Sequence, residues 1–178
     1  MNLIPSHLAG AGILELPHSF DNRGSFTKTF NTPALENIGI NFDLKESYFS
    51  FSSKDVIRGM HFQLPPHDHA KIVFCPLGSI LDVIVDLRKD SPTYGQCDAE
   101  VLSGDNFKAM YIPKGFAHGF KALTDGAMTY YLVSSAYHKD SDTGILYNSI
   151  GLDWDVAKPI MSDRDKGFIE LKDFSSPF

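Results

Sequence analysis

The stretch from Arg58 to Gln63, Arg-Gly-Met-His-Phe-Gln, sets a permanent cation, a histidine and an amide close together. The preceding Val-Ile pair is apolar and β-branched, which predicts that the stretch closes a β-strand. A histidine on the wall of a strand can act as a general base, because its pKa lies near neutrality. A core histidine bonded to backbone groups is the simpler interpretation of an isolated His61. Strand alternation predicts one face with Ile57, Gly59, His61 and Gln63, and the opposite face with Arg58, Met60 and Phe62.

The composition is that of an ordinary globular protein of 178 residues, a length that suits one domain over residues 1–178. Hydrophobic residues make up 43% and the net charge is -6, which argues against nucleic acid as a partner. No apolar run approaches the length of a membrane span, and no signal peptide is expected. Cys75 and Cys97 lack metal-ligand spacing and are interpreted as buried, reduced thiols, so a cytoplasmic location is expected.

Short strands between Gly- and Pro-containing turns dominate the chain, and fourteen Phe and seven Tyr favour β structure. A short helix is expected to begin at Thr32, with Thr32 as its cap and Pro33 at its first position. In the strand expected over residues 79–87, Asp82 and Asp86 fall on one face with Ile84 between them, and the other face carries Leu81, Val83, Val85 and Leu87. No long helical period interrupts this pattern, so the sequence predicts a β-sandwich or jelly-roll barrel.

The segment Pro113–His118 matches the second motif of the cupin barrel, with Pro, Gly and His at the expected offsets. In metal-binding cupins the first motif supplies two His and a Glu. His67 and His69 have His-x-His spacing, but Val73 and Phe74 stand where the Glu would be. A three-ligand site needs a third donor, so no metal is expected, and His67 and His69 are interpreted as solvated loop residues.

Without a metal, the chemistry depends on side chains such as His61, Lys71 and Tyr131. Removing a proton next to a ketone needs a base, a group that stabilises the enolate, and an acid that returns the proton. His, Lys and Tyr can fill these roles. Structural interpretations stand beside them: Lys71 begins an apolar strand and could extend its charge to the surface, and one of Tyr130 and Tyr131 must point outward.

Four runs in order carry specific patterns: Arg58–Gln63, Asp82–Arg88 with Ser91–Gly95, Ile112–Phe120 and Gly144–Asn148. Together they resemble the dTDP-4-dehydrorhamnose 3,5-epimerase family, over nearly the whole chain. The resemblance implies a mainly β, cupin-type jelly-roll barrel with a few short helices, and no cofactor. It implies an epimerase that inverts C3 and/or C5 of a nucleotide-linked 4-keto-6-deoxyhexose. The proton would be removed to give an enolate and returned to the opposite face.

The resemblance also implies the roles of individual residues. His61 is similar to the catalytic base, and Asp165 to the carboxylate that orients it and stabilises its charged form. Lys71 is similar to the residue that stabilises the enolate, and Tyr131, not Tyr130, to the acid. Bidentate, permanently charged Arg suits a diphosphate. The residues at positions that resemble substrate-binding ones are Arg23, Phe26, Lys28, Glu46, Tyr48, Arg58, Gln63, His118, Tyr137, Asp142 and Arg164.

Several of these positions depart from the family pattern. Lys28 reverses the charge of a Glu, Glu46 and Tyr48 replace Gln and Asn, Asp142 shortens a Glu, and Arg164 replaces a Lys. In the family these positions lie mostly around the nucleotide and phosphates, so the reaction is expected to be retained while the nucleotide stays open. Glu46 could accept a hydrogen bond from cytosine, which would give a CDP-linked substrate. Alternatively, Glu46 and Lys28 pair with each other and the dTDP site survives.

Two other functions remain as alternatives. A sugar-nucleotide 3,4-ketoisomerase also moves protons around a keto sugar, but the combination of His61, Tyr131 and Asp165 disfavours it. A non-catalytic barrel that only binds sugar nucleotides would need none of the three. The resemblance further implies a homodimer whose N-terminal strands complete the partner's pocket, and a role in O-antigen, lipopolysaccharide or other deoxysugar biosynthesis.

Overall fold

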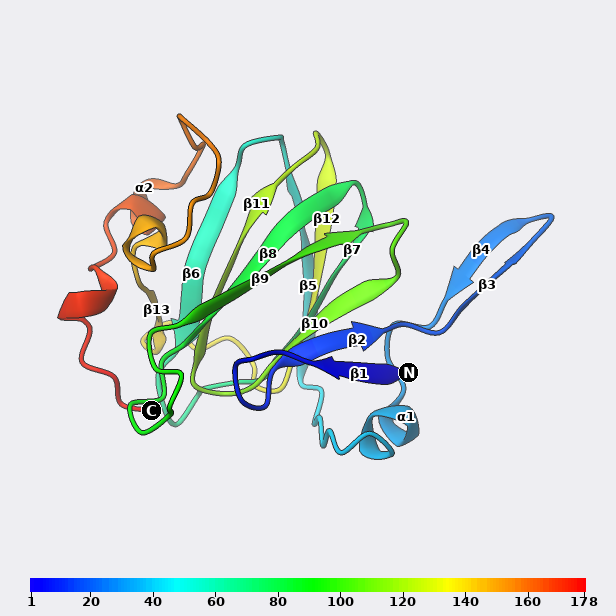
Figure 1. Ribbon diagram of the computed structural model, residues 1–178, viewed down its shortest axis with the longest axis horizontal. Helices are drawn as coiled ribbons and strands as arrows, with labels where there is room; N and C mark the ends of the chain where they lie inside the picture. Colours follow the sequence, from blue (N-terminus) through cyan, green and yellow to red (C-terminus); the bar gives the residue numbers. More distant parts are fainter.

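Two antiparallel sheets lying face to face make up the body of the molecule (Figure 1). The computed structural model describes residues 1–178 and contains thirteen strands, two short α-helices and two 3₁₀ turns. The first sheet has the strand order β1-β2-β10-β7-β12-β5, and the second has the order β13-β6-β11-β8-β9. The predicted mainly β jelly roll with a few short helices is confirmed.

The bounds of the elements are as follows. The first sheet contains β1 (Asn2–Pro5), β2 (Gly12–Glu15), β5 (Glu46–Ser52), β7 (Lys71–Leu77), β10 (Lys108–Ile112) and β12 (Ala127–Val133). The second contains β6 (Ile57–Gln63), β8 (Ser79–Asp86), β9 (Cys97–Ser103), β11 (Phe116–Ala122) and β13 (Asp142–Gly144). A separate hairpin consists of β3 (His18–Asp21) and β4 (Gly24–Thr27). The helices are α1 (Thr32–Glu36) and α2 (Asp163–Lys166), and the 3₁₀ turns are Tyr147–Ser149 and Leu171–Asp173.

The core has three layers, because both sheets are covered on both faces. Val73, Ile84 and Phe120 belong to the cluster between the sheets. Leu35 of α1 covers the outer face of the first sheet, together with residues of the following loop. Trp154 and the C-terminal segment cover the outer face of the second sheet. Strands buried on both faces read as nearly continuous apolar runs, which explains their strong signal in the sequence.

The helix α1 is confirmed, but its predicted cap is wrong by one residue. The side chain of Asn31 accepts a hydrogen bond from the Ala34 backbone N–H at 3.0 Å, so Asn31 is the N-cap. Thr32 is the first helical residue and Pro33 the second. Asn and Thr both suit a cap, and only the backbone angle at Asn31 decides between them. Neither α1 nor α2 approaches the length or hydropathy of a helix that could cross a bilayer.

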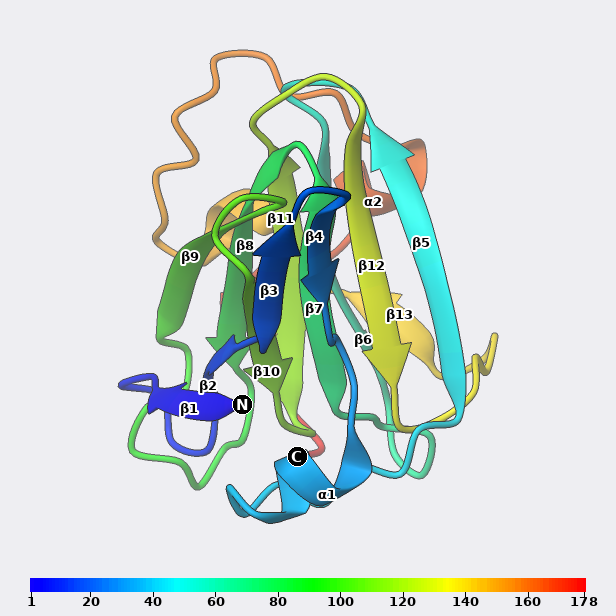
Figure 2. The ribbon, with the colours of Figure 1, turned by 90° about the vertical axis from the view of Figure 1, so that its right-hand side faces the viewer.

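The hairpin of β3 and β4 extends away from the barrel (Figure 1). Its aromatic side chains are solvent-accessible in the single chain, with Phe20 67% and Phe26 63% exposed. At the opposite side of the first sheet, β5 is an edge strand whose outer edge has no neighbour (Figure 2). Phe49 and Phe51 on this strand are more than half exposed.

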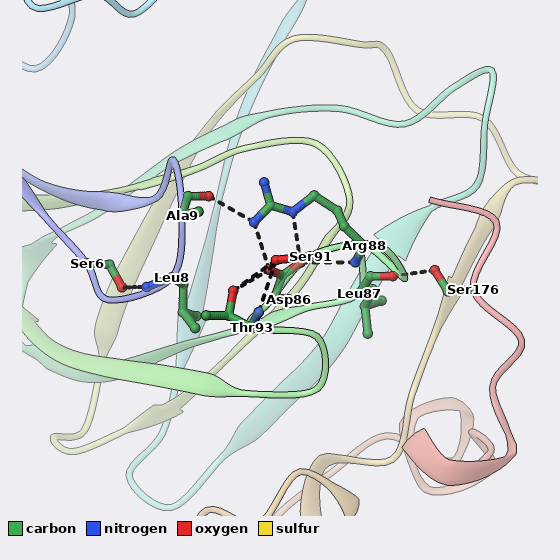
Figure 3. Close-up of polar contacts among 9 residues, drawn as sticks. All are labelled: Ser6, Leu8, Ala9, Asp86, Leu87, Arg88, Ser91, Thr93 and Ser176. Carbon is green, nitrogen blue, oxygen red and sulfur yellow. Dashed lines mark hydrogen bonds and ion pairs between the residues drawn. The ribbon is translucent and has the colours of Figure 1, made fainter.

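The buried carboxylate of Asp86 holds the turn that follows β8. As predicted, Asp86 points to the same face of β8 as Ile84, and it is fully buried. Its oxygens accept hydrogen bonds from Arg88 Nε at 2.8 Å, from Ser91 Oγ at 2.5 Å and from Thr93 Oγ1 at 2.7 Å (Figure 3). Arg88 also donates to the Ala9 carbonyl at 2.9 Å, which ties the N-terminal loop to the turn after β8.

Burial by itself raises the pKa of the Asp86 carboxyl, but the hydrogen bonds from Arg88, Ser91 and Thr93 outweigh it and hold the pKa at about 2. We therefore expect Asp86→Ala to lower the free energy of unfolding at pH 7 by about 3 kcal/mol, because Arg88 would lose its buried partner. In the unfolded chain the pKa of this carboxyl is about 3.9. The stability that the ionised Asp86 contributes is therefore complete above that pH and is lost as the pH falls towards 2. Urea unfolding between pH 7 and pH 2.5 measures both effects.

Glu170→Ala is the matched control, since it removes an exposed carboxylate that pairs with Lys172 at 2.6 Å. Its effect should stay below about 1 kcal/mol at every pH. Equal losses of unfolding free energy in the two variants would contradict the proposed contribution of the Asp86 hydrogen bonds to stability.

Candidate active site

A cavity of about 370 Å³ opens between the two sheets, where β5, β7 and β12 face β6, β11 and β13. The predicted residues that line it are Glu46, Tyr48, Arg58, His61, Gln63, Lys71, His118, Tyr131, Tyr137, Asp142 and Arg164. Asp165 lies directly behind His61. The fold thus brings together side chains from residues 46–71, from residues 118–142 and from α2.

His61 lies on β6 and is held by Asp165, as predicted. The distance between His61 Nε2 and Asp165 Oδ1 is 2.9 Å, and Asp165 Oδ2 accepts the Gly59 backbone N–H at 3.0 Å. The Ser162 hydroxyl caps α2 by accepting the Asp165 N–H. Burial raises the pKa of the Asp165 carboxyl, but these partners outweigh burial and lower it, so Asp165 stays ionised. An ionised carboxylate accepts the Nε2 proton, which leaves the Nδ1 lone pair of neutral His61 free to act as a base.

Arg58 shares the cavity with His61, so the prediction that they occupy opposite faces is wrong. His61 pairs with His118 and Arg58 pairs with Phe120, so three steps along β6 match only two along β11. This β-bulge inserts one residue into β6 and shifts the alternation. Gly59 within it has a φ of +128°, and a Cβ there would lie 2.5 Å from the Gly119 Cα. Only glycine permits this approach of the two strands.

Lys71 approaches from the opposite sheet, at the start of β7. It is buried, and its Nζ donates to the His61 carbonyl at 3.2 Å, so the alternative that it extends to the surface is wrong. Burial lowers the pKa of Lys71 to about 8, against the opposing effect of Asp82 and Asp142. A lysine with this pKa is mostly charged at pH 7, yet can release its proton readily.

Tyr131 points into the cavity from β12, whereas Tyr130 points outward and stacks on Phe74 at 5.1 Å. The Tyr131 ring is 8% exposed and lies between two others. Tyr48 stacks on it at a centroid distance of 4.7 Å, and His118 meets it edge-on at 5.9 Å. Burial raises the pKa of Tyr131 far above its ordinary range, so its phenol remains protonated over the whole physiological pH range.

The sequence did not predict the buried pair of His118 and Asp82, and His118 was expected only as a substrate-binding residue. His118 Nε2 lies 2.7 Å from Asp82 Oδ1, and both side chains are almost inaccessible to solvent. Burial lowers the pKa of His118, against the attraction of Asp82. The signal for Asp82 was present in the sequence: a carboxylate on the inward face of an apolar strand needs a buried partner.

His67 and His69 both lie in a loop, but the interpretation of His69 as solvated is wrong. His69 lines the cavity, its Nδ1 lies 3.0 Å from Gln63 Nε2, and its Nε2 is buried without a partner. Burial lowers its pKa to about 3, so this ring is neutral. His67 stacks on His138 at a centroid distance of 3.7 Å. No group of three His, Cys, Asp or Glu side chains in the structure is arranged to hold a metal ion.

The mouth of the cavity carries both signs of charge. Glu46 Oε2 accepts the Tyr137 backbone N–H at 2.7 Å, and Asp142 pairs with Arg164 at 2.7 Å. The suggested pair of Glu46 and Lys28 does not form within one chain. Arg23, Phe26 and Lys28 belong to the hairpin region outside the cavity, so one chain alone does not place these predicted residues in the site.

Comparison of the chain with known proteins agrees with this geometry. The family model described as dTDP-4-dehydrorhamnose 3,5-epimerase matches residues 5–173. The dTDP-4-dehydrorhamnose 3,5-epimerase of Escherichia coli (strain K12) is 40% identical over 176 residues, which cover 96% of this chain and 95% of the relative. This chain belongs to the dTDP-4-dehydrorhamnose 3,5-epimerase family.

Solved structures of the epimerase family have the same fold. The dTDP-4-dehydrorhamnose 3,5-epimerase from Bacillus anthracis, crystallised with TDP and PPi bound, matches with a TM-score of 0.91 and 38% sequence identity. The match covers 94% of this chain and 98% of the Bacillus anthracis chain. The dTDP-6-deoxy-D-glucose-3,5-epimerase from Legionella pneumophila, in complex with dTDP-4-keto-L-rhamnose, has a TM-score of 0.93 and 34% identity. This match covers 98% of this chain and 94% of the Legionella pneumophila chain. The predicted family, the cupin-type fold and the epimerase class of enzyme are confirmed.

The lowered pKa of Lys71 has a measurable effect on stability. Because the folded pKa is about 8 and the unfolded one about 10.4, the unfolded chain binds more protons between these values. The native protein therefore gains stability as the pH rises from 8 to 10.4, relative to Lys71→Met, by at most about 1.4 kcal/mol per pH unit. We expect Lys71→Met to be more stable than the native protein at pH 7 and to lose this advantage by pH 10, as urea unfolding would measure.

Lys54→Met removes a lysine from an exposed turn and serves as the control. Its difference from the native protein should stay within about 0.5 kcal/mol across the same pH range. A pH-independent difference for Lys71→Met would mean that Lys71 is not desolvated.

Proposed function

We propose that residues 1–178 form one catalytic domain that inverts C3 and C5 of a dTDP-linked 4-keto-6-deoxyhexose. One observation carries this proposal: His61 on one sheet, held from behind by Asp165 of α2, faces a buried lysine and a neutral tyrosine on the opposite sheet, across one cavity. An epimerase must take a proton from one face of the sugar and return it to the other. The opposed walls supply a base and an acid on the two sides.

The reaction follows from these positions. His61 Nδ1 removes the proton next to the C4 ketone, and the resulting imidazolium is stabilised by Asp165. The electrons of the C–H bond move onto the ketone oxygen, where the Lys71 ammonium stabilises the enolate. The Tyr131 hydroxyl then donates its proton to the opposite face of the carbon, and the ketone re-forms. His61 then releases its extra proton to solvent and the Tyr131 phenolate takes one up from solvent, and a second cycle inverts the other carbon.

The basic side chains of the cavity suit a diphosphate. Arg58 donates to the Ser52 hydroxyl and the Phe51 carbonyl, both at 3.1 Å, and its remaining donors are free. Arg164 lies at the mouth. The relatives named for dTDP-linked sugars support dTDP as the nucleotide. Since one carboxylate oxygen of Glu46 already accepts a backbone N–H, Glu46 has a structural role that does not require cytosine.

A homodimer would explain the hairpin. Exposed aromatic residues on a projecting hairpin and an unpaired edge strand, β5, are typical of an interface. We infer that the hairpin reaches the cavity of a partner subunit, where Arg23, Phe26 and Lys28 complete the nucleotide site. A cytoplasmic role in deoxysugar biosynthesis for surface polysaccharide agrees with such a substrate.

Proton NMR in D₂O tests the proposed reaction. With dTDP-4-keto-6-deoxyglucose and the native protein, we expect deuterium to enter at both C3 and C5. In His61→Asn the rate of deuterium entry should be at least about 100-fold lower, because the base is removed. The variant should bind dTDP with an affinity within about threefold of native in calorimetry. Faster reaction of the CDP-linked sugar would overturn the choice of nucleotide, and label at one carbon only would overturn the 3,5 assignment. No exchange with either sugar would overturn the function.

Mixing of subunits tests the dimer. We expect a mass twice that of the 19.8 kDa chain in analytical ultracentrifugation. Arg23→Ala and His61→Asn should each be nearly inactive alone, and their equimolar mixture should recover about one quarter of the native activity. Recovery is expected because the mixed dimer contains one site with a native His61 and a native hairpin. A monomeric mass, or no recovery after subunit exchange, would contradict the interface.

A further inference from the structure

We propose that Tyr48 is a positioning residue for the proton donor Tyr131, and that it controls how the enolate is divided between return to substrate and conversion to product. This inference rests on the proposed function. Tyr48 was expected only as a substrate-binding residue, at a position where the family usually has Asn. A ring at this position makes a contact with Tyr131 that an Asn side chain could not make.

The contact between the two rings is built into the sheet. Tyr48 on β5 and Tyr131 on β12 are directly paired across the two strands. Their rings stack with a centroid distance of 4.7 Å and an interplanar angle of 22°. On the other side of Tyr131, Val73 of β7 is its paired neighbour, and His118 meets its ring edge-on. The phenol is therefore confined to one orientation by its two neighbouring strands and by the facing sheet.

Tyr48 also separates Tyr131 from solvent. Tyr48 is 41% exposed, whereas Tyr131 beneath it is 8% exposed. Edge strand β5 has no further neighbour in the chain, so no strand beyond β5 would cover Tyr131 if the Tyr48 ring were removed. Burial and the proximity of Tyr48 both raise the pKa of Tyr131. With Tyr48 stacked on its ring, the neutral Tyr131 phenol faces the cavity that the substrate would occupy.

The chemical consequence concerns the lifetime of the enolate. Each enolate has two fates: His61 can return a proton to the original face, or Tyr131 can donate to the opposite face. In D₂O, return from an exchanged His61 gives labelled substrate, and donation from Tyr131 gives labelled epimer. A displaced Tyr131 slows only the second step, so labelled substrate accumulates relative to product.

The experiment measures this ratio of labelled substrate to labelled product by proton NMR in D₂O, with dTDP-4-keto-6-deoxyglucose. Because both species come from the same enolate, the ratio does not depend on how tightly the sugar nucleotide binds. We expect the ratio to rise by about tenfold in Tyr48→Ala, as a loss of part of the acid catalysis. Tyr48→Phe retains the ring and should keep the ratio within about twofold of native.

A second pair of variants connects the effect to Tyr131. Tyr131→Phe should itself raise the ratio, and adding Tyr48→Ala to it should raise the ratio no further, because no phenol remains to be positioned. Phe49→Ala is the matched control: Phe49 stacks on Tyr130 in the same strand pair, at 6.2 Å, but on the outer face. This control should leave the ratio at its native value.

The outcomes separate the inference from the proposed function. A native ratio in Tyr48→Ala would overturn the inference while the epimerase function stands. A further rise in the double variant would overturn it too, because Tyr48 would then act independently of Tyr131. A native protein without any exchange would overturn the proposed function together with the inference. If Tyr48→Ala does not fold, Tyr48→Leu fills the same space without an aromatic stack and gives the same test.

Discussion

The hydrogen bond between His61 and Asp165 depends on most of the architecture. The two residues are 104 positions apart. They meet because the C-terminal segment packs on the outer face of the second sheet, where isolated bridges join Val56 to Ile160 and Ile145 to Ile169. This segment has little regular secondary structure, so its position comes from apolar burial, at about 25 cal/mol per Å² of surface. A catalytic pair needs placement within about 0.5 Å, and here packing of the chain's tail supplies it.

Several ionisable side chains of the barrel are buried away from water. Moving a charge out of water is costly unless a partner compensates, and Asp82, Asp86 and Asp165 each have one. Lys71 donates only to the His61 backbone carbonyl, and burial lowers its pKa. Such groups destabilise the fold locally, and the three apolar layers around them offset that cost. The same low dielectric strengthens the interaction of Lys71 with a developing enolate.

Sequence patterns predicted the strands well and failed where a strand departs from regularity. Alternation placed Asp86 on the same face as Ile84 and separated Tyr130 from Tyr131, because β8 pairs with β11 and β12 pairs with β5 without a register shift. It failed for Arg58, because the bulge at Gly59 shifts the period by one residue. It also missed the role of His69, because a residue in a loop has no period from which to read its direction.

The sequence by itself determined the alternation of its strands, its turns and the residue types needed for proton transfer, since these depend on near neighbours. Its long motifs determined the family. Only the tertiary structure decided that Asp165 reaches His61, that Lys71 is desolvated, and that Tyr48 covers Tyr131. It also decided that the hairpin bearing Arg23 lies outside the cavity of its own chain. These facts depend on contacts between residues far apart in the chain, which no local pattern encodes, because sheet pairing and packing set them only when the whole barrel closes.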